Sequence, residues 1–352
     1  MQAICQSIVD YLRSCQVMAG GEFYGSFWSE KAYHAPLLDW HGGGAHHHRG
    51  AGSGGLGLYL TGEKDAQYRA EQAFDWLVAR QNARGGWTET QNNDRPSDWE
   101  YTGAEELSTI ETAFASRGLA SALRAGLPPK ASYLTALRRA GLWFVGMETP
   151  AWSGVFPHHE RSPYDTPNAT LHSVEALGLI FHALRDCYGI RVNIFRAAAF
   201  RGLRHALAQQ RADGCVTYRS SGGVTINYTA LVLYLAMNFL ELWTPEDIAF
   251  EHIAADDFLA RGGDFLAGAV QPDGLFKWDE LETTCARHNV WTYALVWNVL
   301  RRLGRAREAG LIADRLRKWR TDDGGLLPMR DVGEPITRCA FMQADMLLFL
   351  RG

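Results

Sequence analysis

Two patterns of hydrophobic and polar positions alternate along the chain. In the first, apolar residues recur at steps of three and four while Arg, Glu and Asp occupy the opposite side, which is typical of a helix with one buried face. Six segments have this pattern: 1–15, 68–81, 133–146, 194–210, 256–270 and 306–320. The second pattern is apolar around most of the circumference beyond a polar first turn, which indicates a helix buried on all sides. It covers residues 50–60, 106–123, 170–184, 226–243, 287–303 and 337–352.

This alternation predicts an all-α fold of six helical hairpins. The half-exposed helices would form an outer ring around the buried ones, giving a single-domain (α/α)6 toroid, or barrel, over residues 1–352. Long loops lead from each outer helix to the next inner helix, whereas the reverse connections are short. The long loops are 18–45, 83–105, 149–168, 211–223, 271–284 and 321–335. They would gather at one end of the barrel, and long loops commonly carry function, so we expect the site there.

A turn built on glycine recurs between the predicted helices. A glycine is followed two positions later by an aromatic or aliphatic residue at intervals of 50 to 69 residues, a spacing that fits one helical hairpin with its loops. The glycines are Gly25, Gly85, Gly154, Gly214, Gly274 and Gly324. The best-formed example is QNARGGWTE, residues 81–89. We expect its glycine to supply an unusual backbone angle and Trp87 to fill the seam between two hairpins.

This turn resembles the Q-x-x-x-G-x-W repeat of the terpenoid cyclase and protein prenyltransferase superfamily. Gln81, Gly85 and Trp87 match it, and Gln210 and Gly214 match a second copy in which a valine replaces the tryptophan. The resemblance implies an α/α toroid. That architecture is shared with glycan-active lyases, epimerases and glycosidases.

The composition of the chain argues against several kinds of binding partner and cellular compartment. A net charge of −4 and a pI near 6.3 provide no basic field for nucleic acid. The six cysteines form no C-x-x-C pair, so neither a disulfide framework nor a zinc finger is indicated. The first residues lack the basic segment and cleavage site of a signal peptide, and no stretch approaches the roughly 18 apolar residues of a membrane span. We therefore expect a cytoplasmic protein, and its oligomeric state stays open.

Unusual polar residues gather at the starts of the predicted inner helices. Asn168, His172 and Glu175 share one face of a helix because they are spaced i, i+4 and i+7, and His288 forms a similar pair with Trp291. A ring of facing polar groups is expensive to bury without a partner, so we predict a central polar cavity rimmed by aromatic residues. The predicted substrate-binding residues are Trp40, His41, His48, Trp99, Tyr101, Asn168, Asn227, Trp278, His288, Trp291 and Arg338. Taken singly, each is more often a helix cap or a core residue than a ligand.

Aromatic and charged residues mixed in this way suit a sugar, whose ring faces stack on aromatics while its hydroxyls need polar partners. A uronate-type lyase or a sugar epimerase removes a proton beside a carboxylate or carbonyl, and it needs a base, an acid and a cation or amide. His172, Tyr228 and Arg287 are the predicted catalytic residues, with Asn227 as an amide donor. A glycoside hydrolase would instead need two carboxylates, for which Glu106 and Glu175 are available.

Two other classes remain open. A terpenoid cyclase or prenyltransferase is favoured by the turn, but no D-x-D-D motif occurs, and Asp256 and Asp257 fall on an outer helix. A toroid that binds glycans without turnover is the other alternative. No cofactor is predicted; the alternative is a zinc site at Cys285, His288 and Cys339, since thiolate and imidazole are zinc ligands.

Overall fold

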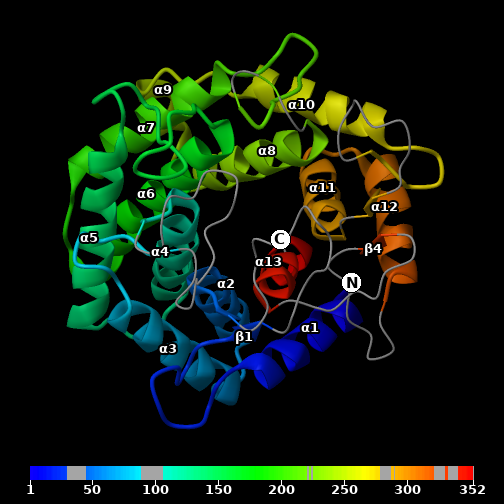
Figure 1. The fold of residues 1–352 in the computed structure, drawn as a ribbon. Coiled ribbons are helices and arrows are strands. Elements are labelled where there is room, and N and C mark those ends of the chain that lie inside the picture. Colours follow the sequence, from blue (N-terminus) through cyan, green and yellow to red (C-terminus); the bar gives the residue numbers. More distant parts are fainter. Residues whose placement is uncertain are drawn as a thin grey trace.

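The computed structural model describes residues 1–29, 45–88, 106–219, 222, 225–277, 287–288, 290–320, 330–331 and 340–351. Within these ranges the chain forms thirteen helices and two pairs of two-residue strands, with no larger sheet. The helices are arranged as two concentric rings (Figure 1), so the predicted (α/α)6 toroid is confirmed.

Six helices make the inner ring. Each packs against the next one along the chain, and the last returns to the first, which closes the ring (Figure 1). They are α2 (His48–Tyr59), α4 (Thr109–Arg124), α6 (Pro167–Tyr188), α8 (Ile226–Leu240), α11 (Val290–Arg302) and α13 (Ala340–Arg351). Nearly every residue of these helices is buried. The segments that read as apolar on all sides are therefore the interior helices, as predicted.

Six amphipathic helices make the outer ring, and each buries one face against the inner ring. They are α1 (Gln2–Cys15), α3 (Lys64–Ala79), α5 (Ala131–Met147), α7 (Asn193–Leu207), α10 (Asp256–Ala269) and α12 (Ala306–Lys318). A further short helix that the pattern did not predict, α9 (Pro245–Phe250), lies between α8 and α10. Thr244 begins it, because its side chain accepts a hydrogen bond from the amide of Asp247 at 3.2 Å.

The longest connections run from an outer helix to the following inner helix, so the inner helices begin at one common end of the barrel. Of the reverse connections only 241–255, which holds α9, is more than a few residues long. Two small antiparallel ladders lie within the connections that lead to inner helices. β1 (Trp28–Ser29) pairs with β2 (Ala45–His46), and β3 (Arg287–His288) pairs with β4 (Arg330–Asp331).

Two of the predicted helix starts that were wrong change the place of candidate site residues. Helix α4 begins at Thr109 because the Ser108 side chain caps it and accepts from the amide of Glu111, so Glu106 lies in the preceding connection. Helix α11 begins at Val290, which leaves Arg287 and His288 on strand β3. The i, i+3 helical pairing predicted for His288 and Trp291 is therefore absent.

The glycine turn fastens one hairpin to the next. The side-chain amide of Gln81 donates to the carbonyl oxygens of Gly85 at 2.7 Å and of Ala136, on the next outer helix, at 2.9 Å. Gly85 has φ of +106°, and a Cβ there would lie 2.4 Å from the carbonyl oxygen of Arg139. The backbone angle requires glycine, as predicted, and the close approach to Arg139 requires it as well.

Trp87 occupies the seam that follows this turn. Its side chain is fully buried, and its indole N–H donates to the carbonyl oxygen of Leu77 at 2.9 Å. The turn also recurs as predicted, since the Gln210 side chain donates to the carbonyl oxygens of Gly214 at 3.0 Å and Phe258 at 2.9 Å.

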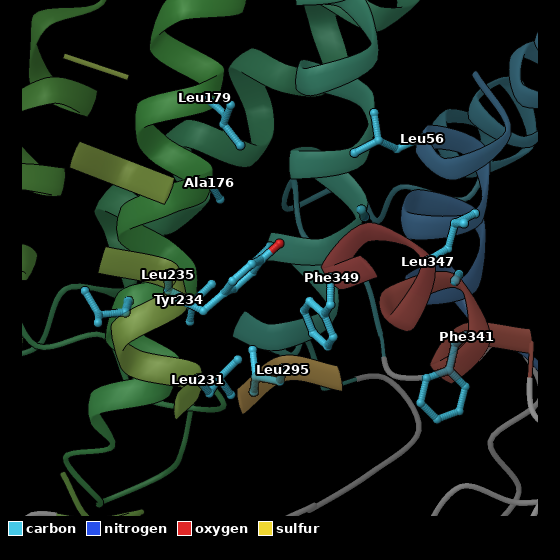
Figure 2. Close-up of a cluster of buried hydrophobic side chains, with 14 of the residues drawn as sticks. Leu56, Ala176, Leu179, Leu231, Tyr234, Leu235, Leu295, Phe341, Leu347 and Phe349 are labelled. Atoms are coloured by element: carbon cyan, nitrogen blue, oxygen red, sulfur yellow. The ribbon is translucent and has the colours of Figure 1, made fainter. Parts of the chain in front are cut away.

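Apolar side chains from several inner helices come together in a buried cluster (Figure 2). Leu179 on α6, Tyr234 on α8 and Phe349 on α13 converge there, and the rings of the latter two meet edge to face at 5.0 Å. No helix among the described residues is both long and apolar enough to cross a membrane.

Candidate functional site

Three cationic or titratable groups converge on the ring of Phe114, on inner helix α4. The guanidinium carbon of Arg49, in the first turn of α2, lies 3.9 Å from the ring centroid, and that of Arg117 lies 4.3 Å away. The imidazole of His172, on α6, contacts the same ring with a centroid separation of 4.9 Å. Both arginines are within range of a cation–π interaction. Helices α2, α4 and α6 thus bring two positive charges and one imidazole to a single point.

Asp345 neutralises Arg49 and ties together three inner helices. Its carboxylate is fully buried on α13 and accepts from both Nε, at 2.9 Å, and Nη2 of Arg49. It also accepts from the Ser53 hydroxyl at 2.7 Å and from the Trp291 indole at 3.2 Å. A buried carboxylate with four donors is well satisfied, so the charge of Arg49 is held in one place.

Glu175 neutralises Arg117 in the same way. One carboxylate oxygen accepts from the Arg117 guanidinium at 2.8 Å, and the other accepts from the Asn238 amide at 2.8 Å. Asn238 in turn accepts from Arg302 at 2.7 Å. Burial alone would lower the pKa of Arg117, but Glu175, through its charge and its hydrogen bond, together with Tyr234 and Asp345 outweighs burial and raises that pKa. Arg117 therefore stays charged, and both oxygens of Glu175 are engaged.

We call the group formed by Arg49, Phe114, Arg117, His172, Glu175, Trp291 and Asp345 the His172 cluster. Among its charged and titratable groups, His172 is the one that is held neutral. Its side chain is buried, and burial together with the charges of Arg117, Arg49 and His158 lowers its pKa well below 6.5. Its Nδ1 atom has no hydrogen-bond partner among the described residues. A neutral imidazole with an unengaged nitrogen can accept a proton, and the two guanidinium groups beside it can stabilise an anion.

A second pair of histidines lies in the connection before α6. The Nδ1 atom of His158 and the Nε2 atom of His159 are 2.7 Å apart, and the amide of Thr109 donates to the carbonyl oxygen of His158 at 2.9 Å. Burial lowers the pKa of both imidazoles, and the carboxylate of Glu106 opposes this effect at His159. The predicted residue Glu106 thus lies beside this pair, and its carboxylate accepts from the amide of Arg161 at 3.2 Å.

The other predicted residues of α8 have neighbours of their own. The ring of Tyr228 packs on Tyr218 with a centroid separation of 4.6 Å. Asn227 accepts from the Thr292 hydroxyl at 2.7 Å. The structure does not join them to the His172 cluster through any described contact, so their catalytic roles stay predictions.

Besides Asn227, three of the predicted binding residues lie at the starts of inner helices. Asn168 is buried on α6, and its Oδ1 atom has no hydrogen-bond partner in the described part of the chain. His48 is buried on α2, where its Nδ1 bonds the carbonyl oxygen of Thr88 at 2.8 Å and its ring stacks on Trp76. Trp291 belongs to the cluster through its bond to Asp345. All three lie at the end of the barrel where the inner helices begin, which is where the sequence predicts the site.

Several predicted residues lie outside the described residues: Trp40, His41, Trp99, Tyr101, Trp278, Cys285, Arg338 and Cys339. The side chains of Arg287 and His288 are likewise not described. The zinc prediction falls on three of these positions and stays a prediction. Among the described residues, no group of three His, Cys, Asp or Glu side chains is placed to hold a metal ion.

Four residues of the cluster were not predicted: Arg49, Phe114, Arg117 and Asp345. Arg117 and Asp345 had a recognisable signal, because each is a charged residue inside an otherwise apolar helical segment. A charge on a helix buried all round must be paired, so such residues should meet partners on neighbouring inner helices.

Two described cavities lie elsewhere. One of about 470 Å³ is lined by Ile226, Asp264, Phe265 and Lys277, and one of about 310 Å³ lies between α3 and α5. Neither is lined by His172 or its neighbours. The predicted central cavity therefore stays a prediction.

Comparison with known proteins supports the fold. No known family model matches the chain, and no curated protein matches it either. Among solved structures, it is similar to the cellobiose 2-epimerase of Bacillus thermoamylovorans, with a TM-score of 0.72, 9% identity and 100% of both chains covered. It is similar to a D-mannose isomerase, with a TM-score of 0.67, 12% identity and 99% of this chain and 96% of that chain covered. It is also similar to a polysaccharide lyase, with a TM-score of 0.65, 10% identity and coverage of 99% and 94%. At these identities the likeness shows the (α/α)6 toroid fold.

Proposed function

We propose that this chain is a carbohydrate-active enzyme that removes a proton beside a carbonyl or carboxylate of a sugar, as an epimerase or a uronate-type lyase. The observation that carries the proposal is the neutral imidazole of His172, which contacts the ring of Phe114 together with two charged guanidinium groups. The reaction requires a base, and it requires a cation where negative charge develops on the substrate oxygen.

Each of these residues has its own role in the reaction. His172 accepts the proton on a ring nitrogen, since its lowered pKa keeps the imidazole unprotonated at neutral pH. Arg49 and Arg117 stabilise the enolate, the role that the sequence assigned to Arg287. Returning the proton to the opposite face of the same carbon gives an epimer. Loss of a leaving group from the neighbouring carbon gives the unsaturated product of a lyase.

The similar structures support a sugar as substrate, because by their names they are a disaccharide epimerase, a sugar isomerase and a polysaccharide lyase. A glycoside hydrolase fits the cluster less well. Both oxygens of Glu175 are engaged by Arg117 and Asn238, so this carboxylate is not available as a nucleophile or as a base toward water.

A terpenoid cyclase or prenyltransferase also fits poorly. Carbocation chemistry needs an apolar pocket, whereas two guanidinium groups beside His172 would repel a developing positive charge.

The test is a panel of compounds incubated with the protein in D2O and followed by NMR. Cellobiose, mannose and oligouronates represent sugars, and an isoprenyl diphosphate represents the competing class. We expect deuterium at a carbon beside a carbonyl for an epimerase, or a new carbon–carbon double bond for a lyase. Release of reducing ends without deuterium at carbon would indicate a hydrolase, and sugar binding without any exchange would indicate a glycan-binding toroid. Turnover of the isoprenyl diphosphate would overturn the proposal.

A further inference from the structure

A solvent-exposed tryptophan lies in the connection from α5 to α6. Trp152 is 65% exposed, and its backbone has a φ of +68°. A positive φ is unfavourable for a residue with a large side chain, because the Cβ atom crowds the backbone there. Among the described residues other than glycine, Trp152 and His252 are the two that have a positive φ. The fold thus accepts a strained backbone at a residue whose side chain lies mostly in water.

The turn that carries Trp152 is larger than other copies of the glycine turn. Three copies close with a backbone hydrogen bond between residues four apart, and these are the copies at Gly85, Gly214 and Gly274. In the copy at Gly154, the amide of Thr149 donates to the carbonyl oxygen of Val155, six residues on, at 3.0 Å. The smaller copies close without a positive φ at any residue other than glycine. Closure of the turn therefore does not explain the added residues or the exposed indole.

One face of the indole is covered by a fixed guanidinium group. The guanidinium carbon of Arg201, on α7, lies over the Trp152 ring at 4.5 Å from its centroid. Glu148 holds this group, because its two carboxylate oxygens accept from Nε of Arg201 at 2.8 Å and from Nη2 at 2.6 Å. The same carboxylate accepts from the amide of Gly154 at 2.8 Å. Glu148 thus fixes both the turn and the group under the ring, and the opposite face of the indole is left open to solvent.

An open and rigidly held aromatic face suits the apolar face of a sugar ring. The face of an aromatic ring is electron-rich, so it attracts the C–H groups that line one side of a pyranose. The ion pair of Arg201 and Glu148 leaves this surface without net charge, which favours a neutral sugar over a charged one. A protein partner needs a contiguous interface of about 1,000 Å² or more, whereas the residues beside the indole in this turn are the small Ala151 and Ser153.

The turn also lies at the appropriate end of the barrel. It follows the last residue of the outer helix α5, so it lies at the end where the inner helices begin. We propose that Trp152 is a stacking platform for a neutral sugar ring of an oligosaccharide, separate from the His172 cluster. This inference deepens the proposed function and rests on it in one respect, that the ligand is a sugar. It assigns a chain of sugars, rather than a free monosaccharide, as the ligand of this protein.

The binding test is isothermal titration calorimetry with cellohexaose and mannohexaose, whose sugars are those named for two of the similar structures. Trp152→Ala should weaken binding about three- to tenfold, the loss expected for one stacking contact. Trp152→Tyr should keep most of the affinity, because it retains an aromatic ring.

The matched control is Phe250→Ala. Phe250 is 74% exposed, but it lies on α9, in a connection from an inner to an outer helix and hence at the opposite end of the barrel. Its removal should leave the affinity equal to that of the wild type. The platform is overturned by unchanged affinity in Trp152→Ala, by an equal loss in the control, or by a wild type that binds neither hexasaccharide.

Two further readouts separate this inference from the others. Binding that depends on Trp152, without proton exchange in D2O on any sugar, would uphold the platform and reject the proposed function. Exchange on cellobiose or mannose by a protein whose hexasaccharide affinity does not depend on Trp152 would do the reverse. Sedimentation velocity checks for a second copy of the chain as the partner. Loss of self-association in Trp152→Ala with unchanged sugar affinity would make the indole an interface between copies and overturn the platform.

Discussion

At the residue scale, the chemistry depends on how neighbours set the charge of buried imidazoles. His172 lies beside two arginines that each have a carboxylate partner, so the cluster holds two ion pairs and one neutral ring. A buried charge is tolerated when it is paired with an opposite charge. His172 has no such partner, and it avoids the free-energy cost of an unpaired buried charge because it remains unprotonated. The same principle acts at His182, a buried histidine farther along α6.

His182 should make the protein sensitive to acid. Its ring lies against Phe181 and Trp243, and burial together with Arg185 and Arg124 lowers its pKa to about 4, against the opposing charges of Asp186 and Asp247. The unfolded chain would protonate this group near 6.5, so stability is complete above that pH and is lost as the pH falls from there toward 4. The shift corresponds to a loss on the order of 3 kcal/mol.

The variant that tests this is His182→Phe, which keeps a ring in place and removes the titratable nitrogens. Urea unfolding at pH 7 and at pH 4.5 should show a smaller loss of stability in the variant than in the wild type. Parallel losses would mean that other groups cause the acid sensitivity.

At the element scale, the glycine turn fixes the position of one helical hairpin relative to the next. Gln81 crosses to the carbonyl oxygen of Ala136, Gly85 lets the backbone approach Arg139, and the buried indole of Trp87 closes the seam. The contacts of Gln81 and Gly85 reach α5 on the next hairpin, and the indole of Trp87 bonds back to α3 through the carbonyl oxygen of Leu77.

Gly85→Ala should therefore be strongly destabilising. Its new Cβ would lie 2.4 Å from a backbone oxygen that cannot move independently of α5, and its φ of +106° is strained for alanine. Gly62→Ala is the matched control, because Gly62 also has positive φ, at +76°, but nothing lies within 4 Å of the added atom. We expect the control to lose about 1 kcal/mol and Gly85→Ala to lose on the order of 3 kcal/mol or more. Equal losses in thermal unfolding would show that the turn is not a close-packed joint.

The elements were largely predictable because their signals are local. The change between one-faced and all-round apolar patterns gave the outer and inner helices, and the recurrent glycine gave the turns between them. Helix starts were less predictable, since the cap at Ser108 and the pairing of β3 with β4 decide where α4 and α11 begin. The strand pairing joins residues far apart in sequence, so no pattern within residues 287–303 could reveal it.

At the scale of the whole molecule, the ring closes where α13 meets α2, and the pair Arg49–Asp345 lies at that closure. Asp345 also reaches α11 through Trp291. Arg49 and Asp345 thus belong both to the candidate site and to the contact between α13 and α2 that closes the ring. The pattern placed His172 and Glu175 on one inner face, but their partners lie on other inner helices between 58 residues (Arg117 to Glu175) and 123 residues (Arg49 to His172) away, and only the ring brings them together.

Asp345→Ala should lower the free energy of unfolding by about 3–5 kcal/mol, because it leaves the charge of Arg49 buried without a partner. The control is the double variant Arg49→Met/Asp345→Leu, which removes both charges and should recover most of that stability. We expect the double variant to fold yet remain inactive, since it lacks one of the two cations beside His172. Urea unfolding and turnover measured on the same preparations check both outcomes, and an active double variant would remove Arg49 from the proposed mechanism.

The most direct test of the account is exchange of a substrate proton with D2O by the wild type and by His172→Asn. Removal of the buried base should slow exchange by about 100-fold or more, while the melting temperature changes by no more than about 2 °C. Exchange at the wild-type rate in a folded His172→Asn protein would contradict the account, and so would a collapse of thermal stability, which would make His172 a structural residue.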